Sequence, residues 1–183
     1  MKKYLVISGL VFISYFLGME IYNEATKDKT PGKAKRLECQ KNVTTFEKAY
    51  NLNDIKTAQE KIKNGNYSFS STIEKAKYAQ SKLFNYISQE QTDKIFENEL
   101  KTYIVKENNQ DAKIQLKYNI YENDIKDPGK KTEKSKLYAG YVWLEIKNER
   151  NLVIYKVQID FMDKEGKDID KSIKCCIKSF MTI

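Results

Sequence analysis

The sequence predicts an α+β domain in which about three helices pack on a four-stranded antiparallel β-meander, with a hydrophobic anchor helix before them at the N-terminus. Three observations predict this arrangement. The chain begins with an apolar run, apolar residues recur every three or four positions over residues 43–107, and apolar and polar residues alternate after about Asp111. Helices that precede the strands of an antiparallel sheet are typical of the α+β class.

The N-terminal run has the pattern of a secretory signal, because Lys2 and Lys3 are followed by mostly apolar residues over Tyr4–Met19. This run is slightly shorter than the roughly 17–25 residues of a spanning helix. The small residues that a cleavage site needs are missing at its end. We therefore predict that residues 1–22 form an uncleaved signal-anchor or transmembrane helix. The alternative is a cleaved signal peptide, which would give a secreted or periplasmic protein.

Residues 23–40 are polar and basic and contain Pro31-Gly32, so we expect a linker or stalk. The lysines before the apolar run favour a cytoplasmic N-terminus, whereas the basic residues after it favour the opposite orientation but lie further from the run. A signal-like segment with so short an N-terminal tail usually exports the domain that comes after it. We therefore expect residues 4–22 to contact the bacterial inner membrane and residues 41–183 to form an extracytoplasmic domain of a single-pass protein.

Residues 43–107 carry the spacing of amphipathic helices. Asn53 is placed to cap a helix that Gly65 ends, and Ser71–Glu74 matches a capping box, which predicts the start of a second helix. A third helix is expected from about Glu90. The residues of the predicted apolar faces are Val43, Phe46, Ala49, Tyr50, Ile55, Ala58, Ile62, Ile73, Ala76, Leu83, Phe84, Ile87, Ile95, Phe96, Leu100, Tyr103 and Ile104.

The second half of the chain has the alternation of half-buried strands. The four predicted strands cover residues 112–120, 137–148, 153–161 and 172–182. Asn148–Asn151 is expected to form a turn and Asp163–Lys167 a hairpin loop. The strand over 137–148 is apolar on both faces, so it is either central or covered on its outer face.

An N-terminal anchor followed by helices and then a curved antiparallel sheet resembles the VirB8-like, NTF2-like domains of bacterial secretion machines. The resemblance implies a cone-shaped domain and a place in a secretion or envelope assembly. The Asn-Pro-x-Gly-type segment associated with that family is absent here, and Pro128 lies in an expected loop. The resemblance is one of layout and assigns a role to no residue.

The three cysteines suggest a disulfide. In the last predicted strand Cys175 points to the core, whereas Cys176 points outward between two lysines, which would lower the pKa of its thiol and make it reactive. In an oxidising compartment Cys39 is expected to bond to Cys175 or Cys176 and so tie the linker to the final strand. A loop of that length is worth roughly 4–5 kcal/mol on the chain-entropy model. Free structural thiols, or a redox or metal role, are the alternatives.

Lysine dominates the charge of the chain. The 33 basic residues include only Arg36 and Arg150 as arginines and, with 25 acidic residues, give a net charge of +8. We expect no nucleic-acid binding, because base edges are read mainly by arginine forks. One basic loop is a candidate for contact with anionic lipid head groups, cell-wall polymers or an acidic partner, and a solvated loop is the alternative. Its lysines are Lys126, Lys130, Lys131, Lys134 and Lys136.

Tyr141 and Trp143 form the candidate partner face. They share the strand face opposite Val142 and Leu144, and Tyr and Trp are common interface anchors. The alternative is that a terminal helix covers them. The chain has no His, no G-x-S-x-G, no glycine-rich phosphate loop and no metal-ligand spacing. We therefore expect no enzyme, no cofactor and no metal site.

The leading functional hypothesis is a non-catalytic, membrane-anchored envelope protein whose extracytoplasmic domain binds or scaffolds another protein. Two alternatives remain open. The first is a small-ligand or lipid carrier, which predicts a cavity lined by Val142, Leu144, Val157 and Ile159, although a small-molecule partner is not what we favour. The second is an immunity or inhibitor protein that neutralises a toxin in the envelope.

Overall fold

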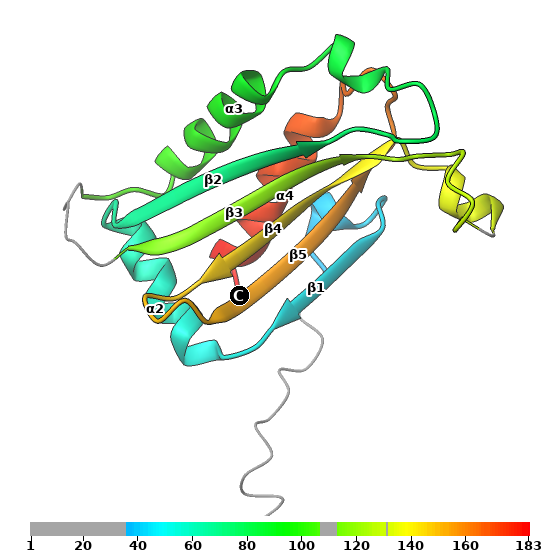
Figure 1. Cartoon of the computed structure of the whole chain (residues 1–183). Coiled ribbons are helices and arrows are strands. Elements are labelled where there is room, and N and C mark those ends of the chain that lie inside the picture. Colours follow the sequence, from blue (N-terminus) through cyan, green and yellow to red (C-terminus); the bar gives the residue numbers. More distant parts are fainter. Residues whose placement is uncertain (1–35, 107–112, 131) are drawn as a thin grey trace, which may run out of the picture. The chain divides into compact units, whose positions relative to one another are not determined.

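The computed structural model describes residues 36–106, 113–130 and 132–183 and confirms the α+β class. These residues contain three α-helices and a five-stranded mixed sheet (Figure 1). None of the described helices is long and apolar enough to cross a membrane. The predicted anchor, residues 1–22, and the predicted linker as far as Lys35 lie outside the described residues.

The sheet differs from the expected four-stranded antiparallel meander. Its strand order is β1-β5-β4-β3-β2, and β2 is parallel to β3 whereas the other neighbours are antiparallel. The strands are β1 (Thr45–Ala49), β2 (Tyr67–Glu74), β3 (Ile114–Glu122), β4 (Gly140–Lys147) and β5 (Val153–Phe161). The meander of β3, β4 and β5 corresponds to the first three predicted strands. The central position of β4 agrees with its two apolar faces.

The edge strand β2 lies where the sequence pattern indicates the start of a helix. Its side chains alternate, and Phe69 faces α3, where its ring lies 5.3 Å from that of Phe96. The Ser71–Glu74 pattern is therefore part of a strand and not a capping box. Aromatic and β-branched residues favour this extended form. The pairing is parallel because the connection from β2 to β3 contains α3, and parallel neighbours need such a crossover.

The other edge strand, β1, replaces the expected helical face over residues 43–50. It pairs with β5 from Thr45 opposite Ile159 to Ala49 opposite Tyr155. Over so short a run, the positions of apolar residues fit a period of two as well as a period of 3.6. The hydrogen bonds to β5 decide between the two forms.

Two helices of the first half, α2 (Leu52–Lys63) and α3 (Gln89–Lys101), lie where the helical spacing predicts them. Asn51, rather than Asn53, caps α2, since the Asn51 side chain accepts two backbone N–H groups of the first turn at 3.0 and 3.1 Å. Gly65 follows the end of α2 with a φ of 72°, which glycine adopts without steric cost.

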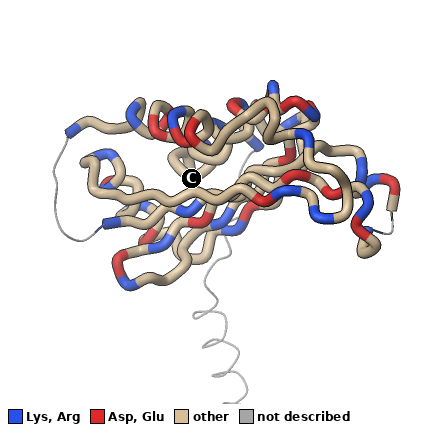
Figure 2. The backbone as a smooth tube through the Cα atoms, turned by 45° about the horizontal axis from the view of Figure 1, so that its top comes forward, with Lys and Arg blue, Asp and Glu red and all other residues tan. Residues whose placement is uncertain are grey.

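The C-terminal segment forms α4 (Ile169–Met181), so the predicted strand over 172–182 is wrong. Ile169, Ile173, Cys176 and Phe180 are buried at spacings of four and three, which is the helical period. α4 packs on β4 and β5, and α3 lies beside it on the same face of the sheet (Figures 1 and 2). The short 3-10 helices are η1 (Glu38–Gln40), η2 (Leu83–Asn85) and η3 (Glu133–Lys136).

The core lies between these helices and the sheet. Its largest fully buried side chains include Tyr118, Tyr155, Phe96 and Phe161. The hydroxyl of Tyr118 donates to Asp93 of α3, so this buried phenol is hydrogen-bonded. Gly140 begins β4 because a Cβ at this position would lie only 2.1 Å from the backbone oxygen of Tyr121.

Candidate functional site

The two faces of β4 have different surroundings. Val142, Leu144 and Ile146 are fully buried against the helix layer, whereas Tyr141 and Trp143 point to the other face and are half-buried. The view in Figure 1 looks onto that other face, with α4 behind the sheet. The α-helices of the described part of the chain lie on the other side of the sheet, so the terminal helix does not cover the two aromatic residues.

This surface, which we call the open face, is defined by the residues that point away from the helices on the three meander strands and β1. The strand pairing aligns them in rows. One row contains Phe46, Gln158, Trp143 and Asn119, and the next contains Asp160, Tyr141 and Tyr121. Phe46 is 63% exposed, although it is a large apolar residue. Its expected place on a helix was wrong, and the sequence pattern therefore did not reveal it as part of this face.

Tyr141 is stacked on Tyr121, with ring centroids 4.6 Å apart. Lys130 places its ammonium 5.6 Å from the ring of Tyr121 and equally far from that of Tyr138, while it donates a hydrogen bond to Asn123. Burial, with the nearby acidic groups, raises the pKa of Tyr141 to about 12, so this phenol stays neutral at physiological pH. The cluster is an aromatic surface that carries one cation.

Trp143 lies beside an ionic cluster. The ammonium of Lys156 is 5.5 Å from the Trp143 ring and 2.9 Å from the carboxylate of Glu145. Lys147 approaches Glu145 from the other side at 3.8 Å. The hydrogen bond from Lys156 to Glu145 raises the pKa of the lysine. Two cations therefore neutralise Glu145, which is itself almost buried.

Cys39 and Cys175 are joined by a disulfide, with their Cα atoms 5.9 Å apart. The bond ties η1 to α4 on the helix side of the sheet. The expected exposure of Cys176 is wrong, because residues 172–182 are helical and the thiol is completely buried. Burial raises the pKa of Cys176, and so does the negative charge of Glu47. The thiol is consequently unreactive in the folded protein.

A buried polar network surrounds this disulfide. Gln40 of η1 donates from Nε2 to the hydroxyl of Ser179 at 2.8 Å and approaches Glu47 at 3.4 Å. Tyr155 donates its hydroxyl proton to the same Glu47 at 2.5 Å. Burial and the charge of Glu47 raise the pKa of Tyr155. These groups attach η1 and β1 to the rest of the domain, so the network has a structural role.

The candidate lysines of the basic loop that the structure describes have different surroundings. Lys130 is held between tyrosines, and Lys136 pairs with Glu133 at 2.9 Å. Lys126 and Lys134 are exposed, and Lys131 lies outside the described residues. Figure 2 shows basic and acidic positions intermixed along the described chain.

Two carboxylates at the end of β3 hold the segment that follows β2. Glu122 accepts backbone N–H groups from Ala76, Lys82 and Leu83 at 2.8 to 3.2 Å. Asp124 accepts those of residues 77, 78 and 79 at 2.6 to 3.0 Å. Burial raises the pKa of each carboxyl, but the hydrogen bonds outweigh it and the net pKa is lowered. The two carboxylates therefore have a structural role in positioning this segment.

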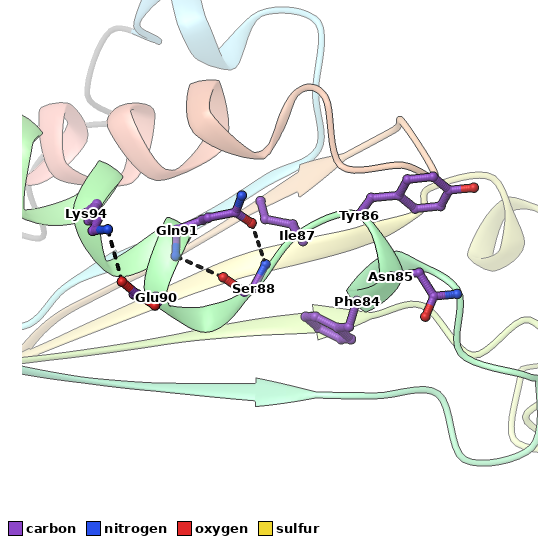
Figure 3. Close-up of a pocket in the computed structure, with 8 residues that line it drawn as sticks. All are labelled: Phe84, Asn85, Tyr86, Ile87, Ser88, Glu90, Gln91 and Lys94. Carbon is purple, nitrogen blue, oxygen red and sulfur yellow. Dashed lines mark hydrogen bonds and ion pairs between the residues drawn. The ribbon is translucent and has the colours of Figure 1, made fainter.

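A hollow of about 440 Å³ lies at the start of α3 (Figure 3). Its charged groups are paired with each other, since Lys94 lies 3.0 Å from Glu90, and Ser88 and Gln91 form a capping box. The rest of its lining is Phe84, Asn85, Tyr86 and Ile87. The hollow offers no free charged group to a ligand.

The four residues expected to line a ligand cavity, Val142, Leu144, Val157 and Ile159, lie in the core beneath α4 and line neither of the two cavities that we describe. Among residues 36–106, 113–130 and 132–183, no three His, Cys, Asp or Glu side chains are grouped as metal ligands.

No protein family matches the chain, and no curated protein or solved structure is significantly similar to it. The resemblance to NTF2-like domains therefore remains one of element order. The parallel β2 and the helical C-terminus depart from the layout on which it was based.

Proposed function

We propose that this protein is a non-catalytic, membrane-anchored envelope protein whose extracytoplasmic domain binds another protein through the open face. The observation that carries the proposal is the position of Tyr141 and Trp143, half-buried, on the sheet face opposite the described α-helices. Aromatic residues of this kind supply a large share of the binding energy at protein interfaces. Lys156 lies over the Trp143 ring, and Lys130 lies over the ring of Tyr121, on which Tyr141 is stacked.

The disulfide between Cys39 and Cys175 supports a location outside the cytoplasm, because such bonds persist in oxidising compartments and are rare in reducing ones. The pattern at residues 1–22 agrees with this location.

The titratable groups with shifted pKa values support a role without catalysis. Glu122 and Asp124 are occupied by backbone N–H groups, Tyr155 is bonded to Glu47, and Cys176 is buried. Each of these shifts has a structural cause, whereas a catalytic group needs a free proton or lone pair beside a substrate.

The partner that we expect is a protein with an acidic surface around an apolar patch. The net charge of +8 favours an acidic partner, and the exposed Phe46, which lies in the same row as Trp143 with Gln158 between them, favours an apolar contact.

Location is tested by trapping the thiols in intact cells with acid and alkylating them after denaturation. We expect a single labelled thiol, that of Cys176, because Cys39 and Cys175 are bonded. Labelling of all three cysteines would place the domain in a reducing compartment and contradict the proposal.

Binding is tested with a photo-crosslinking amino acid at Tyr141, compared with the same amino acid at Lys171, which is exposed on α4 at the opposite side of the sheet. We expect a crosslinked protein from position 141 only. Equal crosslinking from both positions, or none from either, would contradict the proposal. A toxin as the captured protein would favour the immunity role, and a secretion component would favour a scaffold.

A further inference from the structure

A second cavity lies at the end of the sheet where three connections meet, and we call it the end cavity. The connections are the segment after β2, the segment between β3 and β4, and the loop between β5 and α4, which Figure 1 shows at the same end of the sheet. The cavity has a volume of about 330 Å³, which is within the lower range of small-ligand sites. Neither Tyr141 nor Trp143 lines it, and it shares no residue with the hollow of Figure 3.

The walls of the end cavity are mainly apolar. They are formed by Ala76, Ala79, Leu83, Ile125, Tyr138 and Ala139. Ile125 is 46% exposed, so an apolar surface is open to solvent at this place. Burial of such a surface by the apolar part of a ligand is favourable.

Three lysines from three different segments also line the cavity: Lys82, Lys126 and Lys164. None of these ammonium groups makes an ion pair with another residue in the described part of the chain. Other lysines without an ion pair, for example Lys56, Lys101 and Lys171, are exposed elsewhere on the described part of the chain. What distinguishes Lys82, Lys126 and Lys164 is that all three line one largely apolar cavity.

The acidic residue that lines the cavity, Glu122, does not supply the missing counter-ion. Its two oxygens accept hydrogen bonds from three backbone N–H groups, and these bonds stabilise its negative charge. The same bonds fix the position of the segment that carries Lys82.

The loop that carries Lys164 lies close to Leu83. Gly166, with a φ of 77°, permits this approach, since a Cβ at Gly166 would lie 3.1 Å from a methyl carbon of Leu83. The cavity is consequently preformed.

We propose that the end cavity binds a small amphiphilic anion, that is, a carboxylate or phosphate head group attached to a short apolar chain. The head group lies among the ammonium groups of Lys82, Lys126 and Lys164, and the chain lies against Leu83, Ile125 and Tyr138. Free fatty acids and lipids with phosphate head groups share this chemistry. The site is independent of the protein-binding role of the open face.

The test uses the full chain held in nanodiscs of zwitterionic phosphatidylcholine and calorimetric titration, with heats from empty discs subtracted. The ligands are octanoate, octyl phosphate, octanol and inorganic phosphate. We expect octanol and inorganic phosphate to bind at least about tenfold more weakly than octanoate or octyl phosphate, because each lacks one half of the recognised chemistry. Octanol that binds as tightly as octanoate, or inorganic phosphate that binds as tightly as octyl phosphate, would overturn the proposal. Tighter binding of octanoate than of octyl phosphate identifies a fatty acid as the source, and the reverse identifies a phosphate lipid.

Matched charge variants locate the site. The triple variant Lys82→Gln/Lys126→Gln/Lys164→Gln should lose at least about tenfold in affinity for the tighter ligand. The control Lys56→Gln/Lys101→Gln/Lys171→Gln removes as many charges from exposed lysines elsewhere and should stay within about twofold. An equal loss of affinity in both variants would show that net charge alone attracts the ligand, and it would overturn the assignment of the site.

A second pair of variants tests the apolar wall. Ile125→Ser should weaken the binding of both octyl ligands, whereas Leu137→Ser, at an exposed apolar residue of the same connection that does not line the cavity, should not. Because both residues are exposed, neither change should prevent folding. Unchanged binding of the octyl ligands to Ile125→Ser would contradict the placement of the ligand's apolar chain against Ile125.

Discussion

On the helix side of the sheet, Leu144 is completely buried in the core, whereas its neighbour Trp143 on the same strand is half-buried on the open face. The helix side is filled by α4, and the described α-helices do not pack on the open face. The first face holds the domain together, and removal of its side chains leaves cavities. The second is built of stacked rings and ion pairs that keep a partly exposed surface rigid. This difference separates residues that determine stability from residues that are available for binding.

The largest expected effect on stability is that of Leu144→Ala. This change removes a fully buried side chain beneath α4 and should lower the free energy of unfolding by about 2–5 kcal/mol, as measured by urea denaturation. Partner binding per folded molecule should not change. A loss below about 1 kcal/mol would mean that the helix side is not the core that we describe.

Loss of the disulfide should be the next largest effect. Cys39→Ser/Cys175→Ser opens a bond between residues 136 apart in sequence and should cost about 2–4 kcal/mol in the free energy of unfolding. A reductant should destabilise the wild-type protein similarly and leave the double variant unaffected. Equal stability of the wild type with and without reductant would contradict a contribution from this bond.

Acid should weaken the attachment of the segment after β2. The pKa of Glu122 is lowered from an ordinary value of 4.5 and that of Asp124 from 3.8. Their contribution to stability is therefore complete above those ordinary values and is lost as the pH falls through the lowered ones. Asp160 acts in the opposite sense, because burial raises its pKa, and its contribution is lost as the pH rises through that raised value.

Glu122→Gln isolates this effect. The amide turns a donor toward backbone N–H groups that the carboxylate accepted, so we expect a loss of about 1–3 kcal/mol at neutral pH. The variant should also lose less stability than the wild type between about pH 6 and about pH 3. The same pH dependence in both proteins would show that Glu122 does not contribute.

Trp143→Ala should have the smallest effect on stability, about 1 kcal/mol or less, because the ring is only half-buried and lies on the face opposite the core. Thermal unfolding of the variant and of Leu144→Ala under the same conditions checks this. A loss as large as that of Leu144→Ala would show that Trp143 is part of the core.

The elements that the sequence predicts correctly are those with long, single periodic patterns. The apolar positions of α2, α3 and the meander repeat over enough residues to exclude the other period. β1 has only five residues, and its form is decided by pairing with β5, which no local pattern reveals. For α4, the alternation of Ile173, Cys175 and Ile177 suggests a strand, but the wider spacing from Ile169 to Phe180 indicates a helix.

The candidate site could also be predicted only in part from the sequence. Alternation along β4 placed Tyr141 and Trp143 on one face without knowledge of the sheet. Phe46 could not be assigned to the open face from the sequence, because it shares a row with Trp143 only through the order of the strands in the sheet. The hydrogen bonds from backbone N–H groups to Glu122 and Asp124 could not be predicted either, because the sequence does not show which backbone N–H groups a carboxylate accepts.

The most direct test of the account compares the affinity of the crosslinked partner for two purified full-length variants at equal folded fraction, Trp143→Ala and the exposed α4 control Lys171→Ala. We expect Trp143→Ala to lose at least about 2 kcal/mol of binding free energy, about thirtyfold in affinity, and Lys171→Ala to bind as the wild type does. Wild-type affinity in Trp143→Ala would show that the open face is not the binding surface.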